Sequence, residues 1–128
     1  MNPSIDQAVR GLREAFPEAR LTVEEDGSGG AYVRLDNVEL GPRFRPQHSW
    51  IAGHLPPQLP YADIYPLFVG ADVSRVDGVP FSPPVTSGHC FRGCPALQVS
   101  RRTNRLDPTV QTAALKFQKV LHWLRTLP

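Results

Sequence analysis

The segment spanning residues 81–105, FSPPVTSGHCFRGCPALQVSRRTNR, contains both cysteines of the chain, Cys90 and Cys94. His89 directly precedes the first of them, and the segment carries several arginines but no carboxylate. The thiolate is the nucleophilic form of cysteine, and a neighbouring cation favours it. The segment therefore indicates either nucleophilic chemistry on a thiol or recognition of an anion. Cys90, Cys94 and His89 are the candidate catalytic residues.

Cys90 is the preferred nucleophile, because His89 lies beside it and Arg92 follows two positions later. Cys94 is the second choice, since Pro95 fixes the backbone after it and the neighbouring apolar residues favour burial. The alternative is that each thiol is simply a small buried apolar group, which is the usual environment of a free cysteine. The residues alone leave these alternatives open.

A zinc site or a redox pair would be other uses of His89, Cys90 and Cys94. Structural zinc sites need four ligands in paired short spacings. Here one C-x₃-C stands alone, and a fourth ligand would have to come from one of the three other histidines. The spacing also differs from the C-x-x-C of redox motifs. We therefore expect neither a metal nor an organic cofactor.

The arginines that follow the cysteines, Arg101, Arg102 and Arg105, form a basic run. Guanidiniums can bind phosphates in a bidentate manner, but stacking on bases needs aromatic residues, and only Phe91 is near. The formal charge of +2 is too small to require a nucleic-acid partner. A nucleic-acid partner is therefore not expected, and a contact with another protein is the alternative use of this run.

The elements around this segment are predicted from periodicity. A length of 128 residues fits a single domain, residues 1–128, and 41% apolar with 20% charged residues is globular. Residues 4–16 show helical spacing, with Ser4 and Gln7 as a capping box and Pro17 as the stop. A second amphipathic helix is expected after Asp107 as cap and Pro108 as first residue, with Val110 and Phe117 on its buried face.

Alternating residues and turn residues predict strands between the two helices. The expected strands cover residues 21–24, 31–35, 38–40, 48–54 and 67–69, with a further extended segment at 96–99. Glycines at 27, 29 and 30 mark a hairpin turn, and Asp36 with Asn37 marks a second tight turn. Most of the 14 prolines lie in the central half, which is therefore expected to be extended strands and ordered loops. Residues 71–84 are expected to be loop, followed by a long irregular segment that carries the thiols. Segregated helices and antiparallel strands indicate an α+β fold.

This order of elements resembles the fold of ubiquitin-conjugating enzymes, with an N-terminal helix, a meander of about four strands, a long cysteine-bearing loop and a C-terminal helix. Tyr65-Pro66 stands where the family has a Tyr-Pro pair, at the start of the fourth strand. Gly88-His89-Cys90-Phe91, after Pro83-Pro84, is similar to the family's glycine, spacer, cysteine and apolar residue. The C-terminal segment, with the basic run, Lys119 and Trp123-Leu124, is similar to that of prokaryotic relatives of these enzymes.

The resemblance implies a thioester carrier that accepts a ubiquitin-like modifier from an activating enzyme on a loop cysteine and transfers it to an amine. Its partners would be that modifier and that enzyme. The family's His-Pro-Asn triplet is absent, which leaves Asn104 as a candidate oxyanion donor. The alternative is a non-catalytic protein-binding module on the same scaffold, using the arginine-rich loop. No signal peptide or membrane-spanning run is evident, so a cytoplasmic protein with no membrane partner is expected.

Overall fold

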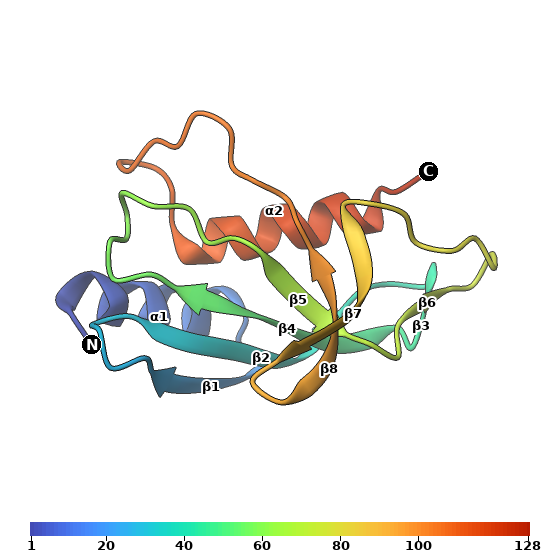
Figure 1. Cartoon of the computed structure of the whole chain (residues 1–128), viewed down its shortest axis with the longest axis horizontal. Helices are drawn as coiled ribbons and strands as arrows, with labels where there is room; N and C mark the ends of the chain where they lie inside the picture. The colour runs from blue at the N-terminus through green and yellow to red at the C-terminus, as the bar shows by residue number, and fades with distance from the viewer.

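The computed structural model describes residues 1–128 and has an α+β architecture (Figure 1). The chain begins with helix α1 (Pro3–Ala15) and ends with helix α2 (Ala113–Arg125), and eight strands lie between them in sequence. The strands are β1 (Arg20–Glu25), β2 (Ala31–Glu39), β3 (Phe44–Arg45), β4 (His48–Leu55), β5 (Leu67–Gly70), β6 (Ser74–Arg75), β7 (Val85–Phe91) and β8 (Cys94–Val99).

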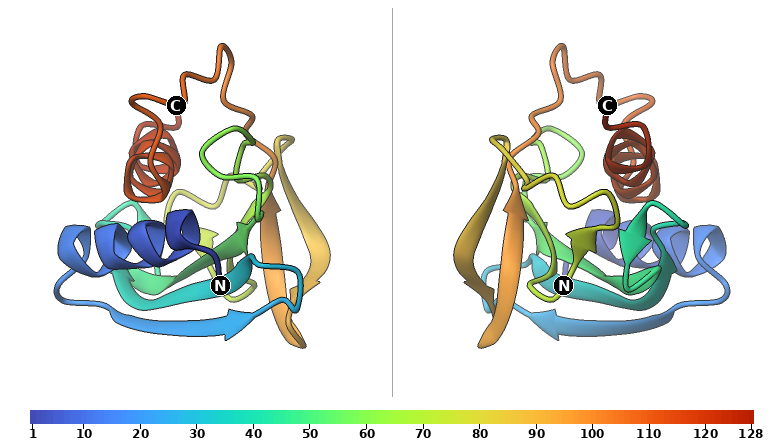
Figure 2. Two further views of the ribbon diagram at one scale, coloured as in Figure 1. Left: turned by 90° about the vertical axis from the view of Figure 1, so that its left-hand side faces the viewer. Right: turned by 90° about the vertical axis from the view of Figure 1, so that its right-hand side faces the viewer.

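Six of the strands form one antiparallel sheet in the order β1-β2-β4-β5-β8-β7, and β3 pairs with β6 in a separate two-stranded ladder. The first four strands of this order follow the chain, so the predicted meander is confirmed. Both helices lie on the same face of the sheet (Figures 1 and 2). At the other side of the molecule β7 and β8 stand almost upright against β1 and β2, so the sheet is strongly curved (Figure 2).

The helices and the sheet enclose the main core, a cluster of 23 buried residues. Phe117 of α2 and Ile5 of α1 are fully buried in it. The first helix is confirmed, but it begins earlier than its capping-box pattern indicates. Asn2 is the cap, because its Oδ1 accepts a hydrogen bond from the Ile5 amide at 3.0 Å, and Pro3 takes the first position.

The second helix begins later than expected. Asp107 does not cap it; its carboxylate accepts hydrogen bonds from the amide and hydroxyl of Thr109 and holds a turn. The cap is Thr112, whose hydroxyl accepts from the Leu115 amide. Val110 therefore precedes the helix and is 59% exposed, so its predicted place on the buried face was wrong, whereas that of Phe117 is confirmed.

The cysteine-bearing segment is a β-hairpin and not the long loop that was expected. Arg92 and Gly93 alone connect β7 to β8, and both have positive φ angles, 47° and 85°. Such two-residue turns match the twist of paired strands, and glycine adopts positive φ without steric cost. Glycines and prolines in this segment suggested irregular backbone, but Gly93 lies in the tight turn and Gly88 in a bulge within the paired strands.

The tight turn expected at Asp36 and Asn37 is a bulge within β2. The register between β2 and β4 shifts between Leu35 and Val38, and the strand continues to Glu39. Asn37 has a φ of 66° and donates a side-chain hydrogen bond to the Glu18 carbonyl. Bulges place an extra residue in one strand and bend it.

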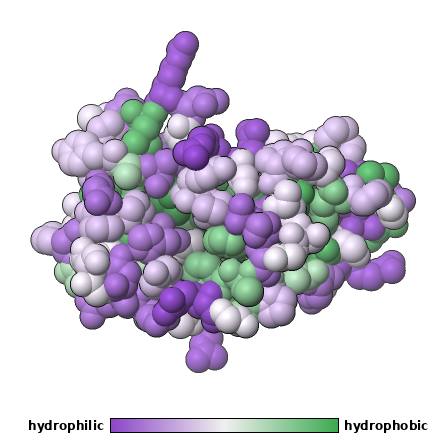
Figure 3. All heavy atoms as spheres, in the orientation of Figure 1, coloured by the Kyte–Doolittle hydropathy of each residue, from purple (hydrophilic) through white to green (hydrophobic).

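The surface of the face seen in Figure 1 is mostly polar, with small separate apolar patches (Figure 3). No helix combines the length and the apolarity that crossing a bilayer requires.

Candidate functional site

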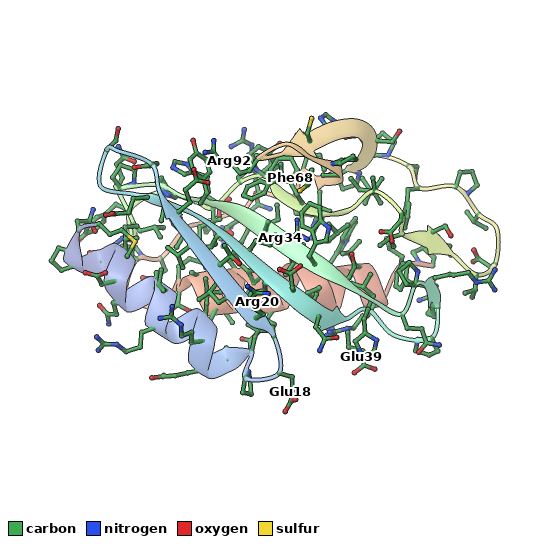
Figure 4. The ribbon with its side chains drawn as sticks, turned by 90° about the horizontal axis from the view of Figure 1, so that it is seen from below. Glu18, Arg20, Arg34, Glu39, Phe68 and Arg92 are labelled. Atoms are coloured by element: carbon green, nitrogen blue, oxygen red, sulfur yellow. The ribbon has the colours of Figure 1, made fainter.

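The face of the sheet opposite the helices carries the candidate site. Successive residues of a strand point to opposite faces, so Tyr32 and Arg34 of β2 share this open face with Trp50 of β4 and Phe68 of β5. Viewed from below, Arg34, Phe68 and Arg92 lie on this side of the sheet, with α2 behind it (Figure 4). We refer to it as the open face.

A small second core forms on the open face under the β7–β8 hairpin. Its buried members are Ala52, Phe91 and Ala96, with aromatic rings packed around them. The Phe91 ring lies 5.3 Å from that of Phe68, 6.2 Å from that of Tyr32 and 6.3 Å from that of Trp50, measured between centroids. Phe91 thus joins the hairpin to three of the other strands.

Arg92, in the turn of the hairpin, contacts the far edge of the sheet. Its Nη2 and Nε donate to the two carboxylate oxygens of Glu24 on β1 at 2.6 and 3.1 Å. Its guanidinium carbon also lies 4.1 Å from the centre of the Tyr32 ring. The hydrogen bond from Arg92 lowers the pKa of Glu24, and the same bond raises that of Arg92. The turn is thereby held against β1 and β2 by a bidentate ion pair and a cation–π contact.

Cys94 faces a second guanidinium. Arg34 Nη1 lies 3.3 Å from the Cys94 Sγ, while Nε and Nη2 of the same residue donate to Asp36 at 3.0 and 2.9 Å. The plane of the guanidinium lies over Trp50, 4.3 Å from its ring centre. Asp36 first, and the thiol to a smaller extent, raise the pKa of Arg34. Arg34 is therefore fixed in position, and its cation is next to a sulfur atom.

This pair borders an open hollow with a cavity volume of about 790 Å³. Its wall includes Arg34, Trp50 and Cys94, and the polar side chains of His48 and Asp72 also line it. Cys94 also lines a smaller space of about 130 Å³ beneath the turn of the hairpin. A half-buried thiol between two spaces can be approached by a substrate while keeping its cation.

The structure does not bring the three predicted residues together. Cys90 is exposed and pairs with Pro95, whereas His89 and Cys94 point to the open face, because adjacent residues of a strand alternate. The His89 Nε2 lies 2.9 Å from the Thr86 hydroxyl. Arg92, which was expected to assist Cys90, is bound to Glu24 instead. The side chains of histidine, cysteine, aspartate and glutamate form no cluster of three that could hold a metal ion.

The arginine-rich run packs on the protein itself. The Arg101 guanidinium carbon lies 4.8 Å from the Trp123 ring centre, and that of Arg102 lies 4.0 Å from that of Tyr65. These two guanidiniums thus have aromatic partners within the chain. The sequence did not predict these contacts, because Trp123 and Tyr65 are distant from the run in sequence.

The same run is anchored to α2 by a buried lysine. Lys116 is only 3% exposed, and its ammonium donates to the Arg101 carbonyl at 2.7 Å and to the Thr103 hydroxyl at 3.0 Å. It also donates to Asp63 Oδ2 at 3.2 Å. All three ammonium protons thus have acceptors, as a buried charge requires. Lys116 lies on the inner side of α2, where the helical pattern alone predicts an apolar residue.

The sequence reasoning missed Arg34, Asp36 and Trp50. One signal was present: Tyr32, Arg34 and Asp36 alternate with Val33 and Leu35, which places the three polar and aromatic residues on one face of a strand. What alternation cannot show is that the hairpin brings Cys94 to that face. No protein-family model, no curated protein and no solved structure matches the chain.

Proposed function

We propose that this protein is a thioester carrier, with Cys94 as the residue that accepts the acyl group. The observation that carries the proposal is the 3.3 Å contact between the Cys94 Sγ and Arg34 Nη1 at the wall of the hollow. The contact places a fixed positive charge beside the sulfur that would attack the donor carbonyl. The resemblance to ubiquitin-conjugating enzymes suggests the donor, a ubiquitin-like modifier on its activating enzyme.

The chemistry needs two exchanges at one carbonyl carbon. First the Cys94 thiolate attacks the donor thioester, a new carbon–sulfur bond forms, and the donor thiolate leaves. An amine then attacks the Cys94 thioester, an amide forms, the Cys94 thiolate leaves, and the amine proton passes to solvent. Arg34 can stabilise the thiolate before the first step and after the second, because Asp36 and Trp50 hold it beside the sulfur.

Cys90 remains the rival acceptor. It is the more exposed thiol, so a large donor reaches it easily. Neither of the residues that favoured it in the sequence hydrogen-bonds to it: His89 is bound to Thr86 and Arg92 to Glu24. Cys94 has a cation at hydrogen-bond distance and a hollow beside it, so the contacts support Cys94 as acceptor.

The test is transfer from a small glycyl thioester, followed by intact-protein mass spectrometry with and without excess thiol. Wild type and Cys90→Ala are expected to form a thiol-sensitive adduct of one glycyl group at similar rates. Cys94→Ala should form it several-fold more slowly. Arg34→Met should slow Cys94 acylation while leaving Cys90 acylation unchanged, so Cys90 serves as the internal reference.

Charging by an activating enzyme, ATP and modifier is the second arm. A thiol-sensitive conjugate that is absent only in Cys94→Ala would support the proposal as stated. Loss in Cys90→Ala alone would move the acceptor to Cys90. Equal, slow acylation of both thiols, with no conjugate from a verified donor, would rule out carrier function.

A non-catalytic protein-binding module is the second candidate, and a groove between the two helices favours it. This groove, of about 470 Å³, lies between α1 and the start of α2 and is bordered by Leu59 and Pro60. Tyr61, 77% exposed, directly follows on the same segment. Exposed apolar residues beside a groove are typical of interaction sites. If a partner still binds the double variant Cys90→Ala with Cys94→Ala but no longer binds Tyr61→Ser, the protein is a binding module of this kind.

A further inference from the structure

The outer half of the β7–β8 hairpin, residues 89–95, extends beyond the sheet that supports it. The register between β5 and β8 runs from Leu67 with Val99 to Gly70 with Ala96 and ends there. On β7 the pairing with β8 is interrupted between Thr86 and His89. Regular pairing with the rest of the sheet therefore ends at Ala96 on β8, and the pairing of β7 with β8 is irregular after Thr86. Beyond Ala96, one backbone hydrogen bond, from the Ala71 amide to the Pro95 carbonyl, connects the hairpin to the chain after β5.

The remaining contacts of residues 89–95 with β1 and β2 are made by side chains. Arg92 binds Glu24 and covers Tyr32, Phe91 packs on the rings of the open face, and the Cys94 thiol meets Arg34. No strand pairing links β7 or β8 to β1 or β2. The Arg92–Glu24 pair is exposed, with 46% and 57% of the two side chains accessible. Exposed ion pairs are weak and are screened by salt.

What lies beneath is a cluster separate from the main core. Ala52, Phe91 and Ala96 are its only buried members, against 23 residues in the main core. Lifting residues 89–95 would therefore disturb this small cluster and leave the helix-covered core intact. Regions with few buried contacts and side-chain anchors are those that open at low free-energy cost. The two-residue turn keeps the strands paired, so this half of the hairpin can move as one piece.

We infer that residues 89–95 form a flap over the open face, that the Arg92–Glu24 pair is its latch, and that the flap controls access of large substrates to the Cys94 thiol. Closed, it keeps Cys94 half-buried beside Arg34. Open, it exposes Cys94 together with the aromatic surface under Phe91. The flap concerns the thiol of the proposed function, but its test uses alkylation alone, so either idea can fail without the other.

The test compares two maleimides on the full-length protein: N-ethylmaleimide and a maleimide on a long poly(ethylene glycol) chain. The reacting group is the same, so the ratio of the bulky to the small reagent's rate reports access. In wild type this ratio should be several-fold lower at Cys94 than at Cys90, as read by peptide mass spectrometry. Glu24→Gln should raise the ratio at Cys94 several-fold and leave it unchanged at Cys90.

Three controls test whether the Arg92–Glu24 pair itself holds the flap closed. Asp77→Asn breaks the ion pair with Arg75, which is remote from the hairpin turn, and should change neither ratio. High salt should raise the Cys94 ratio in wild type but not in Glu24→Gln. The charge-reversed double variant Glu24→Arg with Arg92→Glu should bring the ratio back toward wild type. An unchanged Cys94 ratio in Glu24→Gln, or an equal rise at both cysteines, would overturn the flap.

Discussion

The two faces of the six-stranded sheet are built from different interactions. On the helix-covered face, aliphatic side chains of the sheet pack with Phe117 of α2 in a continuous core of 23 buried residues. The open face presents rings and guanidiniums, with Arg34 over Trp50, Arg92 over Tyr32 and a small buried cluster around Phe91. The first kind of contact is non-directional and scales with buried area; the second depends on the relative placement of charged and aromatic groups.

We infer from this difference that the helix-covered face stabilises the fold, whereas the open face carries the candidate site. A large apolar core can tolerate changes on the opposite side of the sheet, so the open face is free to hold a thiol next to a cation. It also means that the contacts around Cys94 can be altered one at a time without unfolding the chain. Each of the following predictions tests whether the two faces are separable in this way.

The largest effect is expected on the helix-covered face. Phe117→Ala should lower the free energy of unfolding by roughly 3–5 kcal/mol, because it removes a fully buried ring and leaves a cavity. Phe91→Ala should lower it by less, since its cluster is small and lies on the hairpin. Urea denaturation monitored by circular dichroism measures both. Equal losses for the two variants would mean that the faces form one cooperative core.

A smaller effect is expected from Lys116, which ties the arginine-rich run to the helix-covered side. Lys116→Met should cost roughly 1–3 kcal/mol. It removes the donor to the Arg101 carbonyl and the Thr103 hydroxyl, and it leaves the Asp63 carboxylate with only the Thr103 amide as a donor. Hydrogen exchange should speed up in residues 100–106 and remain slow in the β7–β8 hairpin. Lys119→Met, an exposed lysine on the same helix, is the matched control. Faster exchange in the hairpin as well would contradict the separation.

The helix-covered face was the more predictable of the two. Both helices and the strands of the meander follow from periodicity, because burial on one side imposes a regular pattern of apolar residues. The exceptions were local and had local causes. Asp107 and Thr112 are both good caps, and choosing between them requires knowing that Asp107 already binds Thr109. Likewise, Asp36 and Asn37 have turn chemistry, but their neighbours are held in one continuous strand.

The open face was hidden from the sequence for a different reason. Cys94 and Arg34 are 60 positions apart, and they meet only because the sheet curves and the hairpin reaches back to β2. Sequence adjacency was misleading there, since a strand turns His89 and Cys90 to opposite sides. A loop interpretation concealed this alternation. Treating Arg92-Gly93 as a hairpin turn would have paired Phe91 with Cys94 and placed both on one face, but not identified their partner strand.

The smallest effect is expected from a charge on the open-face side, in the turn between β1 and β2. Asp26 Oδ2 lies 2.6 Å from His54 Nε2, and its Oδ1 accepts hydrogen bonds from the amides of Ser28 and Gly30. The bond with His54 is the main cause that lowers the Asp26 pKa below its ordinary value of 3.8, and the backbone amides add to it.

A carboxyl group whose pKa is lower in the folded state stabilises that state wherever it is ionised. This contribution is complete above the unfolded pKa, near 4, and disappears as the pH falls below it through the folded pKa. Asp26→Asn keeps an oxygen for the two amides but loses the charge facing His54. We therefore expect a slightly lower Tm than wild type at pH 7, a smaller difference below pH of about 4, and convergence in stronger acid.

Val9→Ala gives the matched comparison, because Val9 lies in the main core and carries no charge. Its Tm difference from wild type should stay nearly constant over the same pH range, measured by differential scanning calorimetry. The contrast between a pH-dependent and a pH-independent loss would show that the open-face side depends on charges and the helix-covered face on apolar burial. If the Asp26→Asn difference is also constant with pH, the carboxylate acts there only as a hydrogen-bond acceptor, and its charge adds nothing to stability.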